Sequence, residues 1–258
     1  MLSDRIPSKA DIRLIRSLGQ KKFRQEHGLF VVEGEKMVGE ALTQKRYQVE
    51  AVYRTSDIGE ETMGRMSHLS SPSLRDSALA VLRIPDAGGY SGKSSDSELP
   101  EGLCLGLDSV RDPGNVGTIL RLADWFGIET VYLSPDCADL YNPKTIQATM
   151  GSIFRQKTAT CDLVHLARNC RTAGIPVYST ALEGGEDIRT VPLKTDRALV
   201  IMGSERDGVS PALLGESVRR IYIPSAAEGT SDRAESLNVA IATAITCYEM
   251  RLRRIPTI

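Results

Sequence analysis

The chain has 258 residues, of which 41% are hydrophobic, and a formal net charge of −1, so it can build one large domain or two modest ones and is no indiscriminate binder of polyanions. Its five cysteines are odd in number and include no C-x-x-C pair, which argues against a disulfide framework and against a zinc site. The first residues lack the apolar core of a signal peptide, and no segment has the length and apolar character of a membrane span, so we expect a cytoplasmic protein without a membrane partner.

The residues up to 84 predict a small α/β domain. Their periodicity indicates a helix over 11–23, a strand over 28–34, a helix over 35–45, and strands over 49–55 and 77–84. The first 25 residues carry seven basic side chains against two acidic ones, the basic ones being Arg5, Lys9, Arg13, Arg16, Lys21, Lys22 and Arg24. Such a cluster is typical of a phosphate-binding surface and equally typical of a solvated helix face, so both interpretations stand at this point.

A seam follows this first part of the chain. Residues 85–102 read PDAGGYSGKSSDSELPEG and combine proline, glycine, serine and charge without apolar periodicity. This is the composition of a flexible linker. We therefore predict a first domain over 1–90, a linker over 91–101 and a second domain over 102–258, with functions that separate by domain.

The second part of the chain predicts an open parallel sheet. Apolar strand segments over 103–110, 130–134, 175–180, 197–203 and 220–224 alternate with helical stretches. Alternation of this kind is typical of parallel strands joined by helical crossovers, as in doubly wound α/β folds. In such folds ligands bind beyond the carboxyl ends of the strands.

The segment 112–121, DPGNVGTILR, joins a predicted strand to a predicted helix. Asp112 fits the N-cap of that helix, and Pro113 fits its first position. A strand, a glycine loop and a helix amino end together form an anion or nucleotide cradle in many α/β proteins. The glycine spacing here matches neither the dinucleotide fingerprint nor the P-loop, which argues against a dinucleotide-dependent oxidoreductase.

Helical geometry divides the residues after this loop into two sets. The predicted core face consists of Val116, Ile119, Leu120, Ala123 and Phe126. Asn115 lies at the edge of that face, at the crevice beyond the strand end, whereas Arg121 lies well off it beside Trp125. Each also has a structural interpretation, because Asn115 could make a local turn bond and Arg121 could cover Trp125 with its stem.

Two later segments place further polar residues beside predicted element ends. Gly203, Ser204 and Glu205 follow a predicted strand, where glycine permits close approach of a ligand to the backbone. Ser236 and Asn238 precede a predicted apolar helix rich in small residues. Ser236 could simply cap this helix, and Asn238 could simply be a polar residue of its first turn.

In this order, the three segments resemble the signature motifs of the SpoU-type RNA ribose 2′-O-methyltransferases, the TrmH-like members of the SPOUT class. The matching stretches are DSVRDPGNVGTILRLADWFG, VIMGSERDGVS and IPSAAEGTSDRAESLNVAIATAI, and YNPKTIQATMGSIFRQ is similar to the segment between the first two. The resemblance covers residues 101–258. The N-terminal stretch RSLGQKKFRQEHGLFVVEGEKMVGEAL is similar to the substrate-binding domain of many members, which resembles the small α/β fold of RNA-binding ribosomal proteins.

The resemblance implies a parallel-sheet domain knotted as a trefoil, although folded chains generally avoid knots. It implies S-adenosylmethionine as the cofactor, no metal, and a homodimer whose active site draws on both subunits. Ribosomal RNA is the favoured substrate, with transfer RNA or a non-catalytic RNA-binding relative as alternatives. One departure is the segment 225–235, which is longer than the family's compact loop and leaves the cofactor contacts there open.

The resemblance also assigns residues to roles. Catalytic roles go to Asn115, Arg121, Glu205, Ser236 and Asn238. Cofactor binding goes to Thr180, Ala181, Leu182, Gly203, Ser204, Ile223, Pro224 and Leu237. Contact with RNA is expected from Arg13, Arg16, Lys21, Lys22 and Arg24, which favours the phosphate-binding interpretation of the basic cluster.

Overall fold

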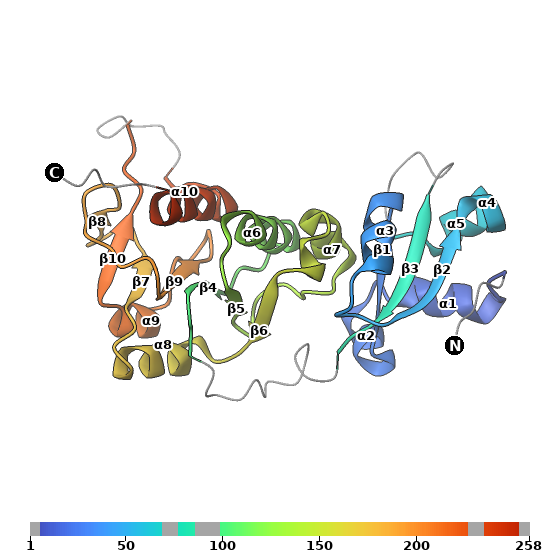
Figure 1. Ribbon diagram of the computed structural model, residues 1–258, viewed down its shortest axis with the longest axis horizontal. Coiled ribbons are helices and arrows are strands. Elements are labelled where there is room, and N and C mark those ends of the chain that lie inside the picture. Colours follow the sequence, from blue (N-terminus) through green and yellow to red (C-terminus); the bar gives the residue numbers. More distant parts are fainter. Residues whose placement is uncertain (1–5, 69–76, 86–98, 227–234, 253–258) are drawn as a thin grey trace.

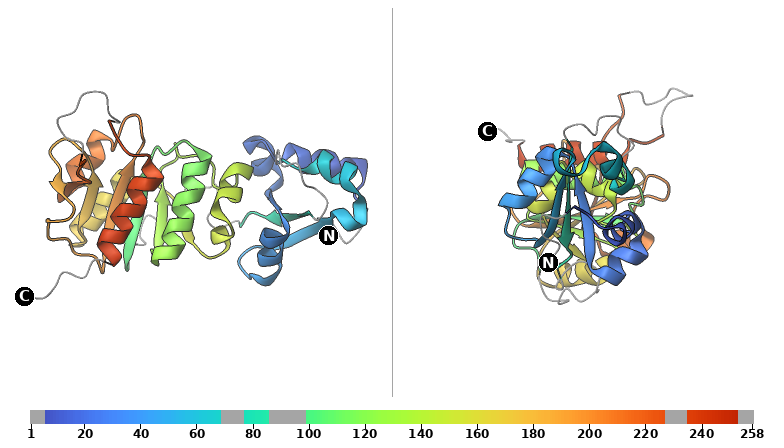
Figure 2. Two further views of the ribbon diagram at one scale, coloured as in Figure 1. Left: turned by 90° about the horizontal axis from the view of Figure 1, so that it is seen from above. Right: turned by 90° about the vertical axis from the view of Figure 1, so that its right-hand side faces the viewer.

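The computed structural model describes residues 6–68, 77–85, 99–226 and 235–252. In this part of the chain, a smaller and a larger α/β domain lie end to end along the longest axis (Figure 1). Figure 2 shows the same arrangement from above. Most of the predicted linker falls on residues 86–98, which lie outside the described residues.

The smaller domain comes first in the chain. Its elements are α1 (Lys9–Ser17), α2 (Lys21–His27), β1 (Leu29–Glu33), α3 (Glu35–Thr43), β2 (Val49–Arg54), α4 (Thr55–Ile58), α5 (Glu60–Met66) and β3 (Ala78–Arg83). The single helix predicted over 11–23 is wrong, because a turn separates α1 from α2. The turn contains Gly19, where a Cβ would lie only 2.7 Å from the ring of His68.

The antiparallel sheet of this domain, of order β1-β3-β2, is buried on both faces. Side chains alternate along a strand, so Leu29 and Val31 join one cluster with Ile15, whereas Phe30 and Val32 join the other. Helices α1 and α5 cover the first face. Helix α3 and part of the larger domain cover the second face.

The larger domain is built on seven strands. Its elements are β4 (Leu103–Asp108), α6 (Pro113–Phe126), β5 (Thr130–Leu133), α7 (Pro143–Thr149), the 3-10 helix η1 (Ser152–Phe154), β6 (Lys157–Thr160), α8 (Leu163–Thr172), β7 (Val177–Thr180), β8 (Glu186–Asp187), β9 (Ala198–Gly203), α9 (Pro211–Glu216), β10 (Arg219–Tyr222) and α10 (Val239–Arg251). The strand order is β6-β5-β4-β9-β7-β10-β8, and every paired strand is parallel to its neighbour. The predicted parallel sheet is confirmed. The strands β6 and β8 escaped prediction because both are short, polar and at the edges of the sheet.

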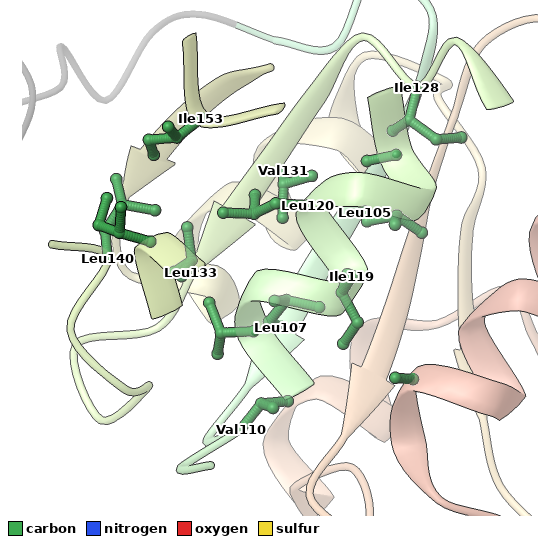
Figure 3. Packing of buried hydrophobic residues seen from close by; sticks show 14 of the residues in the cluster. Leu105, Leu107, Val110, Ile119, Leu120, Ile128, Val131, Leu133, Leu140 and Ile153 are labelled. Carbon is green, nitrogen blue, oxygen red and sulfur yellow. The ribbon is translucent and has the colours of Figure 1, made fainter. Parts of the chain in front are cut away.

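Helices cover both faces of this sheet (Figures 1 and 2). Helices α6 and α10 pack together on one face, and α8 and α9 on the other. The predicted core face of α6 is confirmed, because Val116, Ile119, Leu120 and Ala123 are completely buried and Phe126 is partly buried. Figure 3 shows Ile119 and Leu120 beside Leu105, Leu107 and Val131 of the underlying strands.

The two domains share one apolar cluster, with α7 lying between α6 and the smaller domain (Figures 1 and 2). The ring centroids of Phe30 and Tyr141 are 4.8 Å apart, and those of Tyr47 and Phe154 are 6.0 Å apart. Removal of the smaller domain would expose Tyr141 and Phe154. The smaller domain therefore completes part of the core of the larger one, and the separation of functions by domain stays a prediction.

The cysteines are free thiols, and Cys104, Cys170 and Cys247 are buried. Burial raises the pKa of Cys104 and of Cys247 to about 12 and that of Cys170 to about 11, so these three stay protonated near neutral pH. No helix within the described ranges combines the length and the apolar character that crossing a bilayer requires.

Candidate active site

The candidate site lies at one edge of the larger sheet. Strands β4, β9, β7 and β10 are neighbours in the sheet and run in parallel, so their carboxyl ends meet there. The loops that follow these four strands carry most of the residues assigned from the sequence.

The loop after β9 is a tight turn held at both ends. Ser204 and Gly208 exchange two backbone hydrogen bonds of 3.2 and 3.0 Å, and Asp108 Oδ2 accepts a hydrogen bond of 2.7 Å from Ser210 N. A Cβ on Gly203 would lie 2.1 Å from the carbonyl carbon of Gly208. The chain's own turn therefore requires this glycine, which corrects the expectation that Gly203 leaves space for a ligand.

Three of the five residues assigned to catalysis are in mutual contact. Asn115 Nδ2 and Asn238 Nδ2 each donate a hydrogen bond of 2.7 Å to Glu205 Oε1. Asn238 Nδ2 also lies 3.1 Å from Asn115 Oδ1, and Val239 N lies 3.5 Å from Glu205 Oε1. Glu205 Oε2 accepts no hydrogen bond from the described residues. One carboxylate oxygen is thus approached by three donors, whereas the other has none among the residues that the structure describes.

This carboxylate lies at the amino ends of α6 and α10, where the helix dipole stabilises negative charge. Asp112 caps α6 as predicted, accepting a hydrogen bond of 2.9 Å from Asn115 N, and Pro113 occupies the first helical position. Asn238 caps α10, accepting a hydrogen bond of 2.9 Å from Ala240 N. The suggestion that Ser236 caps this helix is therefore wrong, and the side chain of Asn238 both caps the helix and holds Glu205.

Arg121 and Ser236 stand apart from this cluster. Arg121 follows Asn115 by six residues, which turns it about 240° around the helix axis at about 100° per residue. It is exposed, and neither Arg121 nor Ser236 makes a hydrogen bond or ion pair within the described residues. Trp125 is 83% exposed, so Arg121 does not shield it. That structural interpretation of Arg121 is wrong.

The residues assigned to the cofactor gather on the same edge of the sheet. They are Thr180, Ala181 and Leu182 after β7, Gly203 and Ser204 after β9, Ile223 and Pro224 after β10, and Leu237 before α10. Backbone and side-chain hydrogen bonds tie the first loop down, since Thr180 Oγ1 donates to Ile201 O at 3.2 Å and Ala181 N donates to Ile221 O at 3.0 Å. Leu182 and Leu237 leave their apolar side chains 64% and 47% exposed.

Gly114 and Gly117 of the first motif lie inside α6 rather than in a cradle-shaped loop. A Cβ on Gly117 would lie 2.4 Å from Thr145 O and 2.6 Å from Ala148 Cβ of α7. Gly117 therefore lets α6 and α7 pack in close contact. The expectation of a glycine loop that admits a ligand to the backbone is corrected accordingly.

The basic residues of the smaller domain divide into two groups. Arg13, Arg16, Lys21 and Lys22 are exposed on α1 and α2. Arg24 is only 1% exposed, and its guanidinium donates to Asp139 of the larger domain at 2.5 Å and to Leu18 O at 2.7 Å. The expectation that Arg24 contacts RNA is corrected, because its side chain is buried and its charge is paired with Asp139 inside the protein.

Sequence reasoning missed three charged residues near the cluster. Asp108 anchors the loop that carries Glu205. Arg111 is exposed and unpaired within the described residues. The side chain of Arg206 is 89% exposed, and its Nε lies 3.8 Å from Asp207 Oδ1. Their positions directly before the α6 cap and directly after Glu205 were the available signals. In the described part of the chain, no group of three or more His, Cys, Asp or Glu side chains could hold a metal ion.

Comparison with known families agrees with this geometry. Residues 102–248 match the SpoU rRNA Methylase family, and residues 9–82 match the MRM3-like substrate binding domain. The chain belongs to the SpoU rRNA methylase family.

Relatives of this SpoU methylase cover both of its domains. The 23S rRNA (guanosine(2553)-2′-O)-methyltransferase RlmP of Bacillus subtilis is 30% identical over 250 residues, which are 92% of this chain and 94% of the relative. A TrmH-family protein from Porphyromonas gingivalis is 35% identical, with a TM-score of 0.81 over 96% of this chain and 99% of its own. An AdoMet-bound rRNA methyltransferase from Sinorhizobium meliloti is 29% identical, with a TM-score of 0.81 over 96% and 97%.

Proposed function

We propose that this chain is an enzyme that transfers a methyl group from S-adenosylmethionine to a ribose 2′-hydroxyl of ribosomal RNA. The observation that carries the proposal is the contact of Asn115, Glu205 and Asn238 at the edge where the loops after β7, β9 and β10 meet. The names of the relatives support it, because one is a 23S rRNA 2′-O-methyltransferase and another was solved with AdoMet.

The residues at this edge suit S-adenosylmethionine. The exposed side chains of Leu182 and Leu237 provide apolar surface for an adenine ring, and the charge of Glu205 favours a positively charged sulfonium nearby. Hydrogen bonds fix the backbone at Thr180 and Ala181, which would give the cofactor a rigid surface at the same edge. When bound, the cofactor supplies a methyl group that its positive sulfur already activates for transfer.

The chain's own residues orient and activate the RNA hydroxyl. A ribose hydroxyl is a weak nucleophile until its proton leaves, so placement and stabilisation of the developing charge matter most. Glu205 Oε2, which has no donor among the described residues, would accept a hydrogen bond from the hydroxyl while Asn115 and Asn238 hold Oε1. Arg121 suits stabilisation of the oxygen and of the neighbouring phosphate, because a guanidinium offers two parallel donors in one plane.

The active form in this proposal is a homodimer in which Arg121 from a second copy joins the cluster. Within one copy, Arg121 points away from Glu205, so the assigned set is incomplete. Trp125 on α6, Ile241 and Tyr248 on the neighbouring α10, and Leu252 directly after α10 are between 52% and 83% exposed. A face of this kind supports contact with another protein surface, and a second copy is the occupant that would also complete the site.

The basic face of the smaller domain serves RNA binding in this proposal. Arg13, Arg16, Lys21 and Lys22 remain its candidates, because all four are exposed. Arg111 and Arg206 extend the positive charge to the loops beside Glu205. RNA phosphates could thus be held at both ends of the molecule.

The proposal includes a trefoil knot and a cytoplasmic location. The strand order supports the knot, since β9 lies between β4 and β7 and the last helix, α10, packs against α6. The free cysteines support a reducing compartment.

Two measurements test the function. Calorimetric titration should detect binding of S-adenosylmethionine and none of NAD. Mapping of 2′-O-methyl positions in ribosomal and transfer RNA from cells with and without the protein should show a ribosomal position that depends on it. Loss of a transfer RNA position instead, or no change in either RNA, would contradict the substrate assignment.

A further inference from the structure

The junction between the domains contains charged contacts as well as the shared apolar core. Arg24 Nη2 donates to Asp139 Oδ2 at 2.5 Å, and the two side chains are 1% and 7% exposed. Burial of an ion pair costs free energy of desolvation, and an apolar pair of similar volume is often at least as stable. What the ion pair provides is a directional contact, which allows one relative placement of α2 and the segment before α7.

From Asp139 a continuous set of contacts leads to α6. Asp139 O accepts a hydrogen bond of 3.0 Å from Thr145 Oγ1, which lies on α7. Helix α7 meets α6 at Gly117, where a Cβ would lie 2.4 Å from Thr145 O. Gly117 lies between Asn115 and Arg121 on α6. A displacement of the smaller domain would therefore be transmitted to the helix that carries both residues.

A second set of contacts reaches α6 at its other end. Arg155 Nη1 donates to Glu40 Oε2 of α3 at 2.6 Å, and Arg155 Nη2 lies 3.0 Å from Asp124 Oδ2 of α6. Ser152 Oγ donates to the same Asp124 oxygen at 2.8 Å. The carboxylate of Glu40 lies directly over Gly151, where a Cβ would be 2.1 Å from Glu40 Oε2 and where φ is +96°. Only glycine fits there without strain.

We propose that Arg24, Asp139 and Arg155 are positioning residues that fix the RNA-binding face of the smaller domain relative to α6. The enzyme then selects its nucleotide by the distance of that nucleotide from a second feature of a folded RNA, in the manner of a ruler. This inference rests on the proposed function. None of the three residues contacts RNA; they act through α6, and a misplacement of about 1 Å at the reacting groups can cost about a hundredfold in rate.

The variants are chosen to loosen the junction without unfolding the protein. The double variant Arg24→Met with Asp139→Leu removes both buried charges and keeps apolar volume, which leaves no unpaired charge behind. Arg155→Gln removes the second contact at a half-exposed position. Arg168→Gln is the matched control, because Arg168 forms a comparable surface ion pair with Glu216 within the larger domain. Arg13→Gln serves as the control for direct contact with RNA.

The assay is single-turnover methyl transfer to an unmodified 23S rRNA transcript, well below the melting temperature of each variant. We expect the junction variants to bind RNA with unchanged affinity and salt dependence, to bind S-adenosylmethionine normally, and to lose about tenfold or more in rate at saturating RNA. Methyl groups should also appear at extra positions. Arg13→Gln should instead weaken RNA binding and lower its salt dependence, and Arg168→Gln should alter neither RNA binding nor the rate.

Two outcomes would overturn the inference alone: a lowered melting temperature with a wild-type rate and a single methylated position, or weaker RNA binding with a reduced salt slope. The first would make the junction purely structural, and the second would place these residues on the RNA. If the wild-type enzyme methylated no 23S rRNA, the proposed function would fail and this inference with it.

Discussion

The surroundings of Glu205 determine which of its two carboxylate oxygens is held within the protein. Its Oε1 is held by two amides and approached by a backbone N–H, whereas its Oε2 faces no donor among the described residues. The described residues therefore fix the orientation of this side chain and leave Oε2 without a partner among them. Preorganised polar groups of this kind do most for a reaction in which charge develops at a known place.

Arg121 is the residue whose replacement tests the chemistry most directly. Because its planar fork cannot be reproduced by an ammonium group, we expect Arg121→Lys to fail nearly as badly as Arg121→Ala, with a loss of about a hundredfold or more in single-turnover rate. Stability and affinity for S-adenosylmethionine should barely change, since the side chain is exposed and unpaired in the described structure. Arg171→Lys, on the opposite face of the sheet, is the control. Transfer by Arg121→Ala at a near wild-type rate would remove Arg121 from the mechanism.

Glu33 gives the smaller domain a dependence on pH. Burial disfavours its charge, but hydrogen bonds from His68 and Ser67 outweigh that effect and lower the pKa of Glu33 below its usual value. A lowered carboxyl pKa means stability that is present above the unfolded pKa and is lost as the pH falls through the folded pKa. Denaturant unfolding should therefore show stability falling from about pH 5 downwards.

In Glu33→Gln this part of the pH dependence should vanish, and the variant should lose about 1.5–3 kcal/mol at neutral pH, the usual contribution of hydrogen bonds to a charged group. Glu35→Gln, at an exposed position two residues later, should retain the wild-type profile. Identical pH profiles for wild type and Glu33→Gln would contradict this account.

The location of a site residue could be predicted from the sequence where the local pattern of strand and helix ends determined it. Asn115, Glu205 and Asn238 stand at strand or helix ends, so parallel-sheet geometry alone brings them to one edge. Arg24 could not be assigned in this way, because its partner Asp139 is 115 residues away and only the docked domains reveal the pair. In the sequence, nothing distinguishes Arg24 from the exposed basic residues Lys21 and Lys22 beside it.

At the scale of elements, the close contact of α6 with α7 places a strict limit on Gly117. Alanine favours a helix over glycine by about 1 kcal/mol, but its Cβ would be 2.4 Å from a backbone oxygen that no side-chain rotation can move. Overpacking costs about 1–3 kcal/mol, so we expect Gly117→Ala to destabilise the protein and to slow methyl transfer by shifting Asn115.

The control for this variant is Gly39→Ala within α3, where a Cβ would meet nothing within 4 Å. That change should be neutral or stabilising by up to about 1 kcal/mol. Thermal unfolding of both variants makes the comparison. A stabilised Gly117→Ala would mean that the two helices can separate freely.

Most elements follow from periodicity and end signals. The five apolar strands of the larger sheet and the start of α6 at Pro113 were predictable because long apolar runs and caps are local features. The break between α1 and α2 was missed, because the apolar periodicity continues across the turn that contains Gly19. The meaning of the motif glycines likewise required the positions of the neighbouring elements.

At the scale of the whole molecule, the exposed face of α6 and α10 predicts self-association. The one tryptophan of the chain, Trp125, is 83% exposed on α6, so its burial in a dimer should shift its emission to shorter wavelength as protein concentration rises. Tyr248→Asp should raise the dimer dissociation constant at least tenfold, since it places a charge in an apolar contact. Analytical ultracentrifugation measures both proteins.

Leu42→Asp provides the matched control, because Leu42 is 50% exposed on α3 of the smaller domain, away from that face. It should leave association unchanged. Tyr248→Asp should also lose methyl transfer in proportion to the monomer present, because Arg121 then lacks its second copy. A monomeric wild type with full activity would contradict the proposed dimer.

The segment from Asp139 to Gln156 has a consequence for how such enzymes can be recombined. It belongs by sequence to the larger domain, yet its surface is shaped by Phe30, Glu40 and Tyr47 of the smaller one. In a chimera joined at the linker, the smaller domain of one enzyme would therefore pack against a segment 139–156 of another enzyme whose side chains do not match it. The unit that can be exchanged between enzymes is therefore discontinuous in sequence. It consists of the first domain together with residues 139–156, and both parts have to be transferred together.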